Sequence, residues 1–298
     1  MLPKLIVIAG TNASGKSALG VELALHYDGE IISADSRQVF RGLNLGSGKI
    51  TPEEMKGVPH HLIDVCNPND FFSVVDYQKL AYQAIDDIHA RGKIPFLVGG
   101  TGLYISSVVQ GYEMSSCEPD LAYRAELEKL ETQALYEMLK AIQPDTDVEP
   151  HNRNRVMRVL EKIHDGDTVE PKKQKRYDSL TLGVSWPKDV LWERILERIQ
   201  RRLDQGMIEE VQELLNSGAS VLFMQKLGVE YRIITDYIQG AYASKQEMLD
   251  LLAIAIRQFA KRQMTWFRRP GQVDLWLDMN DDPMRQAMQA IDTFLIKE

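Results

Sequence analysis

Residues 10–17 read GTNASGKS and match the phosphate-loop pattern G-x-x-x-x-G-K-[ST] in full. The apolar run Leu5–Ala9 stands just before this stretch and predicts a buried strand. A helical pattern with Leu19, Leu23 and Ala24 on one face follows it. A strand, a glycine-bearing loop and a helix start together form a nest of backbone N–H groups that binds phosphate. The stretch therefore predicts a site for a small molecule that carries a diphosphate.

Each residue of this loop has an expected part. Lys16 should reach the phosphates, and the Ser17 hydroxyl should ligate Mg²⁺, the expected cofactor. The alternative is an ordinary turn between a strand and a helix, which the complete pattern in its strand and helix context disfavours. The predicted diphosphate-binding residues are Gly10, Thr11, Asn12, Ala13, Ser14, Gly15, Lys16 and Ser17.

The first hundred residues alternate strand and helix. Further strands are expected at residues 30–36, 60–65 and 94–100, and Ser73 with Asp76 predicts a capping box that opens a helix ending at Gly92. This rhythm predicts an α/β fold of the phosphate-loop NTPase kind, a parallel sheet with helices on both faces.

The character of the chain changes after Gly111. Residues 113–177 read as helical and polar and predict an inserted all-helical lobe, whereas residues 1–112 and 178–298 form the core. The sheet should resume at residues 179–186. Helices should follow over residues 188–216, with a break at Gly206, and over residues 231–240 and 244–267.

Bulk composition is that of a soluble globular protein. The 298 residues are 44% hydrophobic and 26% charged, with no run of 18 apolar residues, so we expect no membrane span and no signal peptide. The two cysteines lack metal-ligand spacing, and a reduced cytoplasmic protein, expected as a monomer, is the default.

Charge is sorted into blocks along the chain. The formal net charge of −8 argues mildly against nucleic acid. However, residues 151–176 hold eight Lys or Arg against four acids, and residues 257–269 hold five basic residues and no acid. Such blocks indicate a polyanion partner, although a solvated helix face is the commoner reason for a single charged run.

Two further positions should face the phosphate loop. Asp35 and Thr101 each stand at the carboxyl end of a predicted strand, where open α/β sheets bind their ligands. A carboxylate there can act as a general base or bind Mg²⁺ through water, and it can also simply cap a loop. Glycines 99 and 100 before Thr101 would let backbone approach a ligand closely.

These stretches, taken in order, resemble one family. SADSRQVFRGLNLGSGK, VPHHLIDV, FSVVDY, IPFLVGGTGLY, RIQRRLDQGMIEEVQELL and QFAKRQMTWFRR resemble the bacterial tRNA dimethylallyltransferases, also called tRNA isopentenyltransferases, from Leu5 to about Arg269. The resemblance implies transfer of a dimethylallyl group from dimethylallyl diphosphate to the exocyclic N6 amine of the adenosine 3′-adjacent to the anticodon in tRNA, with release of diphosphate. Phosphate-loop, nucleotide-binding and tRNA-modifying properties come with that family.

The resemblance also implies roles for particular residues. Asp35 would be the catalytic base, Lys16 would stabilise the leaving diphosphate, and Thr101 would lie near the reacting adenine. The inserted lobe would hold the tRNA anticodon stem-loop. The residues that match tRNA-contacting positions are Asp35, Ser36, Arg37, Gln38, Thr101, Arg124, Asn154, Arg155, Val156, Met157, Arg158, Gln225, Lys226 and Gly228.

One stretch departs from the family pattern. The family commonly has Q-x-x-G-Y followed by a basic and an acidic residue, and residues 225–232 here read QKLGVEYR. Val229 thus stands where a tyrosine is expected, and we expect Tyr231 and Arg232 to compensate from nearby.

Three other functions remain open at this point. An adenylate isopentenyltransferase, which makes a cytokinin from AMP or ADP, would share the phosphate loop and Asp35 without needing the lobe. A small-molecule kinase would bind ATP at residues 10–17 and use Asp35 to activate a hydroxyl. An RNA-binding protein with a relic nucleotide loop would bind tRNA without turnover.

Overall fold

One parallel sheet organises the chain, which is described by a computed structural model over residues 2–113, 120–166 and 173–296. The strand order is β3-β2-β4-β1-β5-β6, and every pairing is parallel. The strands are β1 (Lys4–Ala9), β2 (Gly29–Ala34), β3 (His60–His61), β4 (Ile94–Gly99), β5 (Asp178–Ser185) and β6 (Leu275–Asp278). This arrangement confirms the expected phosphate-loop type of α/β fold.

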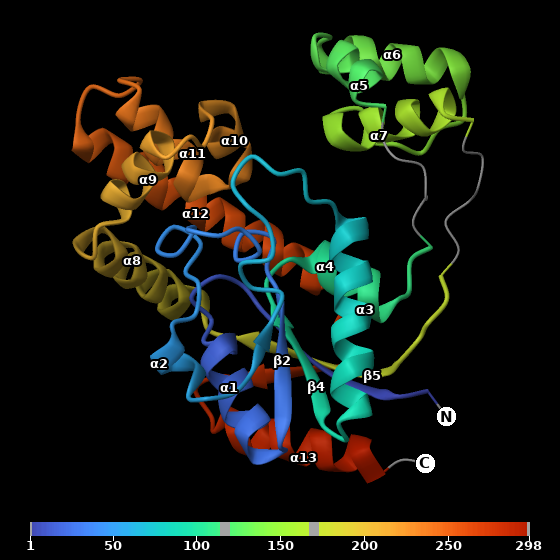
Figure 1. Ribbon diagram of the computed structural model, residues 1–298, viewed down its shortest axis with the longest axis vertical. Coiled ribbons are helices and arrows are strands. Elements are labelled where there is room, and N and C mark those ends of the chain that lie inside the picture. The colour runs from blue at the N-terminus through green and yellow to red at the C-terminus, as the bar shows by residue number, and fades with distance from the viewer. Residues whose placement is uncertain (1, 114–119, 167–172, 297–298) are drawn as a thin grey trace. The chain divides into compact units, whose positions relative to one another are not determined.

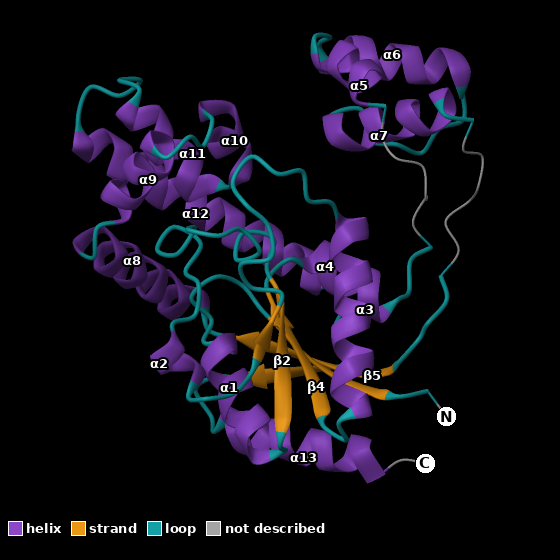
Figure 2. Ribbon diagram, in the orientation of Figure 1, coloured by secondary structure: helices purple, strands orange, loops and turns teal. Residues whose placement is uncertain are grey.

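Helices cover both faces of the sheet (Figure 2). Side chains of β1 alternate between the faces: Leu5 and Val7 pack in the cluster with α3 (Val74–Ala90) and α4 (Gly102–Val109), and Ile6 and Ile8 pack with α1 (Lys16–His26) and α13 (Pro283–Ile296). Because both faces are covered, the strands read as unbroken apolar runs.

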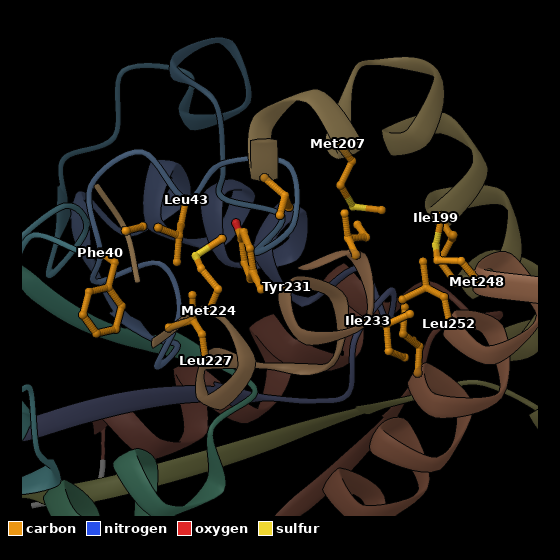
Figure 3. Close-up of a cluster of buried hydrophobic side chains, with 14 of the residues drawn as sticks. Phe40, Leu43, Ile199, Met207, Met224, Leu227, Tyr231, Ile233, Met248 and Leu252 are labelled. Atoms are coloured by element: carbon orange, nitrogen blue, oxygen red, sulfur yellow. The ribbon is translucent and has the colours of Figure 1, made fainter. Parts of the chain in front are cut away.

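A second layer of helices follows β5 along the chain (Figure 1). It consists of α8 (Lys188–Asp204), α9 (Met207–Asn216), α10 (Val221–Leu227), α11 (Val229–Ile238) and α12 (Lys245–Phe267). These helices share an apolar core with Phe40 and Leu43, which lie in the long connection after β2 (Figure 3). The short α2 (Pro52–Met55) lies in the same connection.

The chain divides into two compact units. One comprises Met1–Gly111 and Lys175–Glu298, and the other is Tyr112–Gln174, compared with residues 113–177 for the lobe expected from sequence. The second unit contains α5 (Leu121–Glu128), α6 (Thr132–Ile142) and α7 (Arg153–His164), which pack around their own apolar core.

The strand expected at residues 60–65 is only two residues long. His60 and His61 pair with β2, but Leu62 and Asp64 have φ angles of 62° and 56°, which take the chain out of an extended conformation. The capping box at α3 is confirmed, since the Ser73 hydroxyl accepts from the Asp76 N–H at 3.3 Å and the Asp76 carboxylate accepts from the Ser73 N–H at 2.8 Å. In the described ranges no helix is long and apolar enough to span a bilayer.

The strand order determines which loops lie side by side at the carboxyl edge of the sheet. Strand β4 lies between β1 and β2, so the segments that leave these three strands are neighbours. They are the phosphate loop after β1, Asp35 after β2 and Thr101 after β4.

Candidate active site

The phosphate loop packs tightly against the sheet. The Gly10 N–H donates to the Gly99 carbonyl of β4 at 3.3 Å, and a Cβ on Gly10 would lie 2.4 Å from a methyl of Val184. Gly15, at the start of α1, has a φ of 85°, a conformation that glycine adopts without strain. Both glycines of the pattern are therefore required by the shape of the loop.

Lys16 is held inside this loop. Its side chain is buried, and its ammonium donates to the Thr11 carbonyl at 3.2 Å. Burial, reinforced by the charge of Arg198, lowers the pKa of Lys16 to about 8. A bound anion would offset both effects, so the lysine is poised for a phosphate ligand.

A cavity of about 510 Å³ opens above the loop, and we call it the anion cavity. Lys16 and Ser17 line it from one side. Four arginines of α8 line the other, namely Arg194, Arg198, Arg201 and Arg202. Within the described part of the chain no carboxylate forms an ion pair with any of the four, and burial lowers the pKa of Arg198 and of Arg202. The basic side chains of the lining outnumber its two acidic ones, Glu54 and Glu197, and this excess of positive charge indicates a polyanionic ligand.

Sequence reasoning did not single out these arginines. In the sequence they are separated by four, three and one residues, which places them on one face of a helix. This spacing could have identified them as candidate site residues. Arg194 is also fixed by the loop, because its Nε–H donates to the Ala13 carbonyl at 3.1 Å and its guanidinium stacks on Trp186.

A second cavity, of about 320 Å³, contains Asp35, and we call it the Asp35 cavity. The carboxylate oxygen Oδ1 accepts from the N–H groups of Arg37 at 2.8 Å and Gln38 at 3.4 Å. Among the described residues nothing donates to Oδ2. Asp35 thus both caps its turn and offers one oxygen to a ligand.

Thr101 fixes the neighbouring strand end beside Asp35. Its N–H donates to the Ala34 carbonyl at 3.1 Å, and its hydroxyl accepts from the Ser36 N–H at 3.0 Å. The same hydroxyl donates to the Ser36 hydroxyl at 3.3 Å. The ends of β2 and β4 are therefore joined directly at the cavity.

Most of the other core residues predicted to contact tRNA also gather here. The lining of the Asp35 cavity includes Ser36, Arg37, Thr101, Gln225, Lys226 and Gly228, and also Asn12, which was predicted to bind the diphosphate. Gly228 allows Arg37 to approach, since a Cβ there would lie 2.8 Å from the arginine Nε. Gln225 is anchored by its amide, which donates to Asp236 at 2.6 Å.

Gln38 and Tyr231 lie elsewhere. The Gln38 side-chain oxygen accepts from the Ser33 hydroxyl at 3.2 Å, and its amide nitrogen donates to the Gly48 carbonyl at 3.3 Å. Together with Ser17, Gln38 lines a separate small cavity. Tyr231 is 1% exposed in the apolar core and does not line the Asp35 cavity. Its ring packs with apolar neighbours, whereas Val229 and Arg232 do line the cavity.

Gln263 of α12 connects the two strand-end loops, and sequence reasoning missed it. Its side-chain oxygen accepts from the Asn12 N–H at 3.0 Å, and its amide donates to the Gly100 carbonyl at 2.9 Å. The available signal was a glutamine within the basic block of residues 257–269, and the structure places it on the buried face of α12.

The lobe carries the remaining predicted tRNA contacts. Arg124 and Arg158 both pair with the buried carboxylate of Glu161, at 2.9 and 3.2 Å. Asn154 and Arg155 are exposed, so their side chains can meet a ligand.

Two residues of that predicted segment need a correction. The side chains of Val156 and Met157 are buried in the lobe core, where apolar packing holds them away from any ligand. Their part is to support the exposed residues beside them.

The fold and these two cavities define a phosphate-loop protein with an arginine-lined cavity next to a carboxylate-bearing one, at one edge of its sheet. Residues 38–270 match the IPP transferase family. The chain belongs to this family.

Individual relatives agree over nearly the whole chain. A tRNA dimethylallyltransferase of Exiguobacterium is 44% identical over 92% of this chain and 90% of its own length. One from Halalkalibacterium halodurans is 40% identical over 99% of this chain and 97% of its own length.

Two solved structures are similar to the chain. The full-length tRNA isopentenylpyrophosphate transferase of Bacillus halodurans has a TM-score of 0.75 at 38% identity, covering 98% of this chain and 96% of its own. A eukaryotic dimethylallyltransferase acting on tRNA has a TM-score of 0.82 at 27% identity, covering 99% of this chain and 79% of its own.

Proposed function

We propose that this chain transfers the dimethylallyl group of dimethylallyl diphosphate to the exocyclic N6 amine of the adenosine 3′-adjacent to the anticodon in tRNA, releasing diphosphate. One observation carries the proposal: an arginine-lined anion cavity and a cavity with a free carboxylate oxygen are built on adjacent strand ends. The relatives are named tRNA dimethylallyltransferases, which supports the transfer of this group to tRNA. Such an enzyme would act in the cytoplasm, where tRNA is found.

The anion cavity suits a leaving diphosphate. As the bond between the allylic carbon and oxygen breaks, negative charge grows on the diphosphate, and Lys16, the loop N–H groups and the α8 arginines can stabilise it. No phosphoryl group moves, so the phosphate loop holds a leaving group.

Ser17 is the proposed protein ligand of Mg²⁺. Among the described residues no three His, Cys, Asp or Glu side chains converge, so most ligands would be diphosphate oxygens and water, as Mg²⁺ commonly prefers. The Ser17 hydroxyl lines the anion cavity, which fits this arrangement. When bound, the ion neutralises part of the diphosphate charge.

Asp35 is the proposed proton acceptor. The adenine N6 amine is a poor nucleophile because its lone pair is delocalised into the ring, so removal of its proton assists attack. The nitrogen–carbon bond forms as the carbon–oxygen bond breaks, and the amine proton passes to Oδ2 of Asp35. A base in this cavity must leave its stack, and exposed arginines of the lobe such as Arg155 would bind phosphates of the same tRNA.

The acceptor decides between this function and its alternatives. The protein is incubated with labelled dimethylallyl diphosphate and, separately, with unmodified tRNA, AMP or ADP. Label should enter tRNA alone; label in AMP or ADP would indicate an adenylate isopentenyltransferase. Transfer of the labelled γ-phosphate of ATP to a small hydroxyl compound would indicate a kinase, and tRNA binding without transfer would indicate an RNA-binding protein.

A further inference from the structure

The segment Leu43–Lys49 contributes to both cavities, and we call it the partition loop. Asn44, Leu45, Gly48 and Lys49 line the anion cavity, and Gly46 and Ser47 line the Asp35 cavity. The loop has no regular secondary structure of its own. Its position therefore depends on what its backbone N–H groups bind.

One carboxylate binds three successive N–H groups of this loop. Glu210 of α9 accepts from Asn44 at 3.1 Å and Leu45 at 2.6 Å through Oε2, and from Gly46 at 3.1 Å through Oε1. Hydrogen bonds to a charged acceptor are roughly twice as strong as neutral ones. The contact fixes the loop at its centre.

Tyr231 binds the next N–H group and the same carboxylate. Its hydroxyl accepts from the Ser47 N–H at 3.0 Å and donates to Glu210 at 2.9 Å. The ring lies in the apolar core with Leu43 (Figure 3), and a Cβ on Gly46 would lie 2.5 Å from it. Two side chains thus hold four consecutive amides, although neither side chain lines either cavity.

The partition loop also contacts the α8 arginines. The Arg198 guanidinium donates to the Gly48 carbonyl at 3.3 Å, and a Cβ on Gly48 would overlap Arg202. A displacement of the loop would therefore change the anion cavity and the Asp35 cavity together.

We propose that Glu210 and Tyr231 are positioning residues that fix the partition loop, and that they thereby determine which allyl chain length the enzyme transfers efficiently. The inference rests on the proposed function. Reacting atoms must approach to about 3–3.5 Å, and a misplacement of about 1 Å can lower the rate about 100-fold. Leu45 is the large apolar side chain that the loop presents to the anion cavity, where it can limit the space for an allyl chain.

The test uses Tyr231→Phe, which keeps the ring and removes the hydroxyl. We expect kcat for dimethylallyl transfer to tRNA to fall at least tenfold, with KM for dimethylallyl diphosphate changed less than twofold. The ratio of kcat/KM for geranyl diphosphate to that for dimethylallyl diphosphate should rise at least tenfold, and hydrogen exchange at residues 44–47 should accelerate. Glu210→Gln is the second variant and should shift the same quantities in the same direction.

Tyr237→Phe is the matched control, because Tyr237 is on the same helix and, among the described residues, its hydroxyl makes no hydrogen bond to the partition loop. The proposal is overturned if both test variants keep the wild-type kcat and chain-length ratio, or if exchange at residues 44–47 is unchanged. Failure of the proposed function is a different result, since wild-type protein would then transfer no label to tRNA.

Discussion

At the scale of single residues, Asp35 performs two tasks with its two oxygens. Oδ1 caps the turn at Arg37 and Gln38, whereas Oδ2 accepts from no described residue, and the side chain lines the cavity. Asp35→Asn keeps an oxygen for the turn and loses the proton acceptor. We expect transfer to tRNA to fall about 10²–10⁴-fold, the usual contribution of a general base. Calorimetric affinity for inorganic diphosphate should change less than twofold, and normal turnover by the variant would refute the assignment.

The buried Lys16 ammonium, which is expected to bind the diphosphate, should lower the free energy of unfolding of the unliganded protein. Its folded pKa of about 8 lies below the ordinary lysine pKa of 10.5, so between these pH values the unfolded chain binds more protons. The burial penalty is therefore complete below pH 8 and disappears as pH rises toward 10.5. At about 1.36 kcal/mol per pKa unit it is on the order of 3 kcal/mol.

Lys16→Met removes this penalty together with the charge. The variant should have a higher Tm than wild type at pH 7 and should lose affinity for diphosphate. Thermal melts at pH 7 and pH 10 test the cause, because the gain should shrink at the higher pH. A gain that is equal at both values would mean that the buried charge is not its origin.

At the scale of elements, local signals determined what could be predicted. The phosphate loop with its strand and helix, the capping box at Ser73 and the break at Gly206 each depend on neighbouring residues, and the structure shows all three. The strand at residues 275–278 and the helix after it were not predicted, because a four-residue edge strand is recognised only through its pairing with β5. The α8 arginines and Gln263 were missed for a similar reason: which helix face meets a cavity depends on tertiary packing.

Helix α7 offers a direct test of the predicted tRNA surface. The Arg155 side chain is 57% exposed and only 3.8 Å from the exposed Asp147, so removing its charge leaves no buried partner. Arg155→Gln should weaken tRNA binding and reduce the slope of log K against log salt by about 0.7–0.9 for one lost phosphate contact. Arg285→Gln on α13, with a similar exposure and an exposed partner, is the control and should leave the slope unchanged. An identical slope for both variants would remove this helix from the RNA interface.

At the scale of the whole molecule, the inserted unit can be separated from the chemistry. It has its own apolar core, and the first unit holds the sheet, both cavities and the partition loop. Tyr112 and Lys173 form a bridge at the base of the insertion, so a short linker can join Gly111 to Lys175. Replacing Tyr112–Gln174 with a Gly-Ser linker should leave the core folded.

The shortened protein should bind diphosphate within twofold of the full chain, because Lys16 and the α8 arginines remain in place. Its affinity for tRNA should fall more than tenfold, since the phosphate contacts of the lobe are lost. Filter binding measures the second quantity and calorimetry the first, with the full chain as reference. If the shortened protein binds and prenylates tRNA as well as the full chain does, the core alone recognises the acceptor and the lobe has another role.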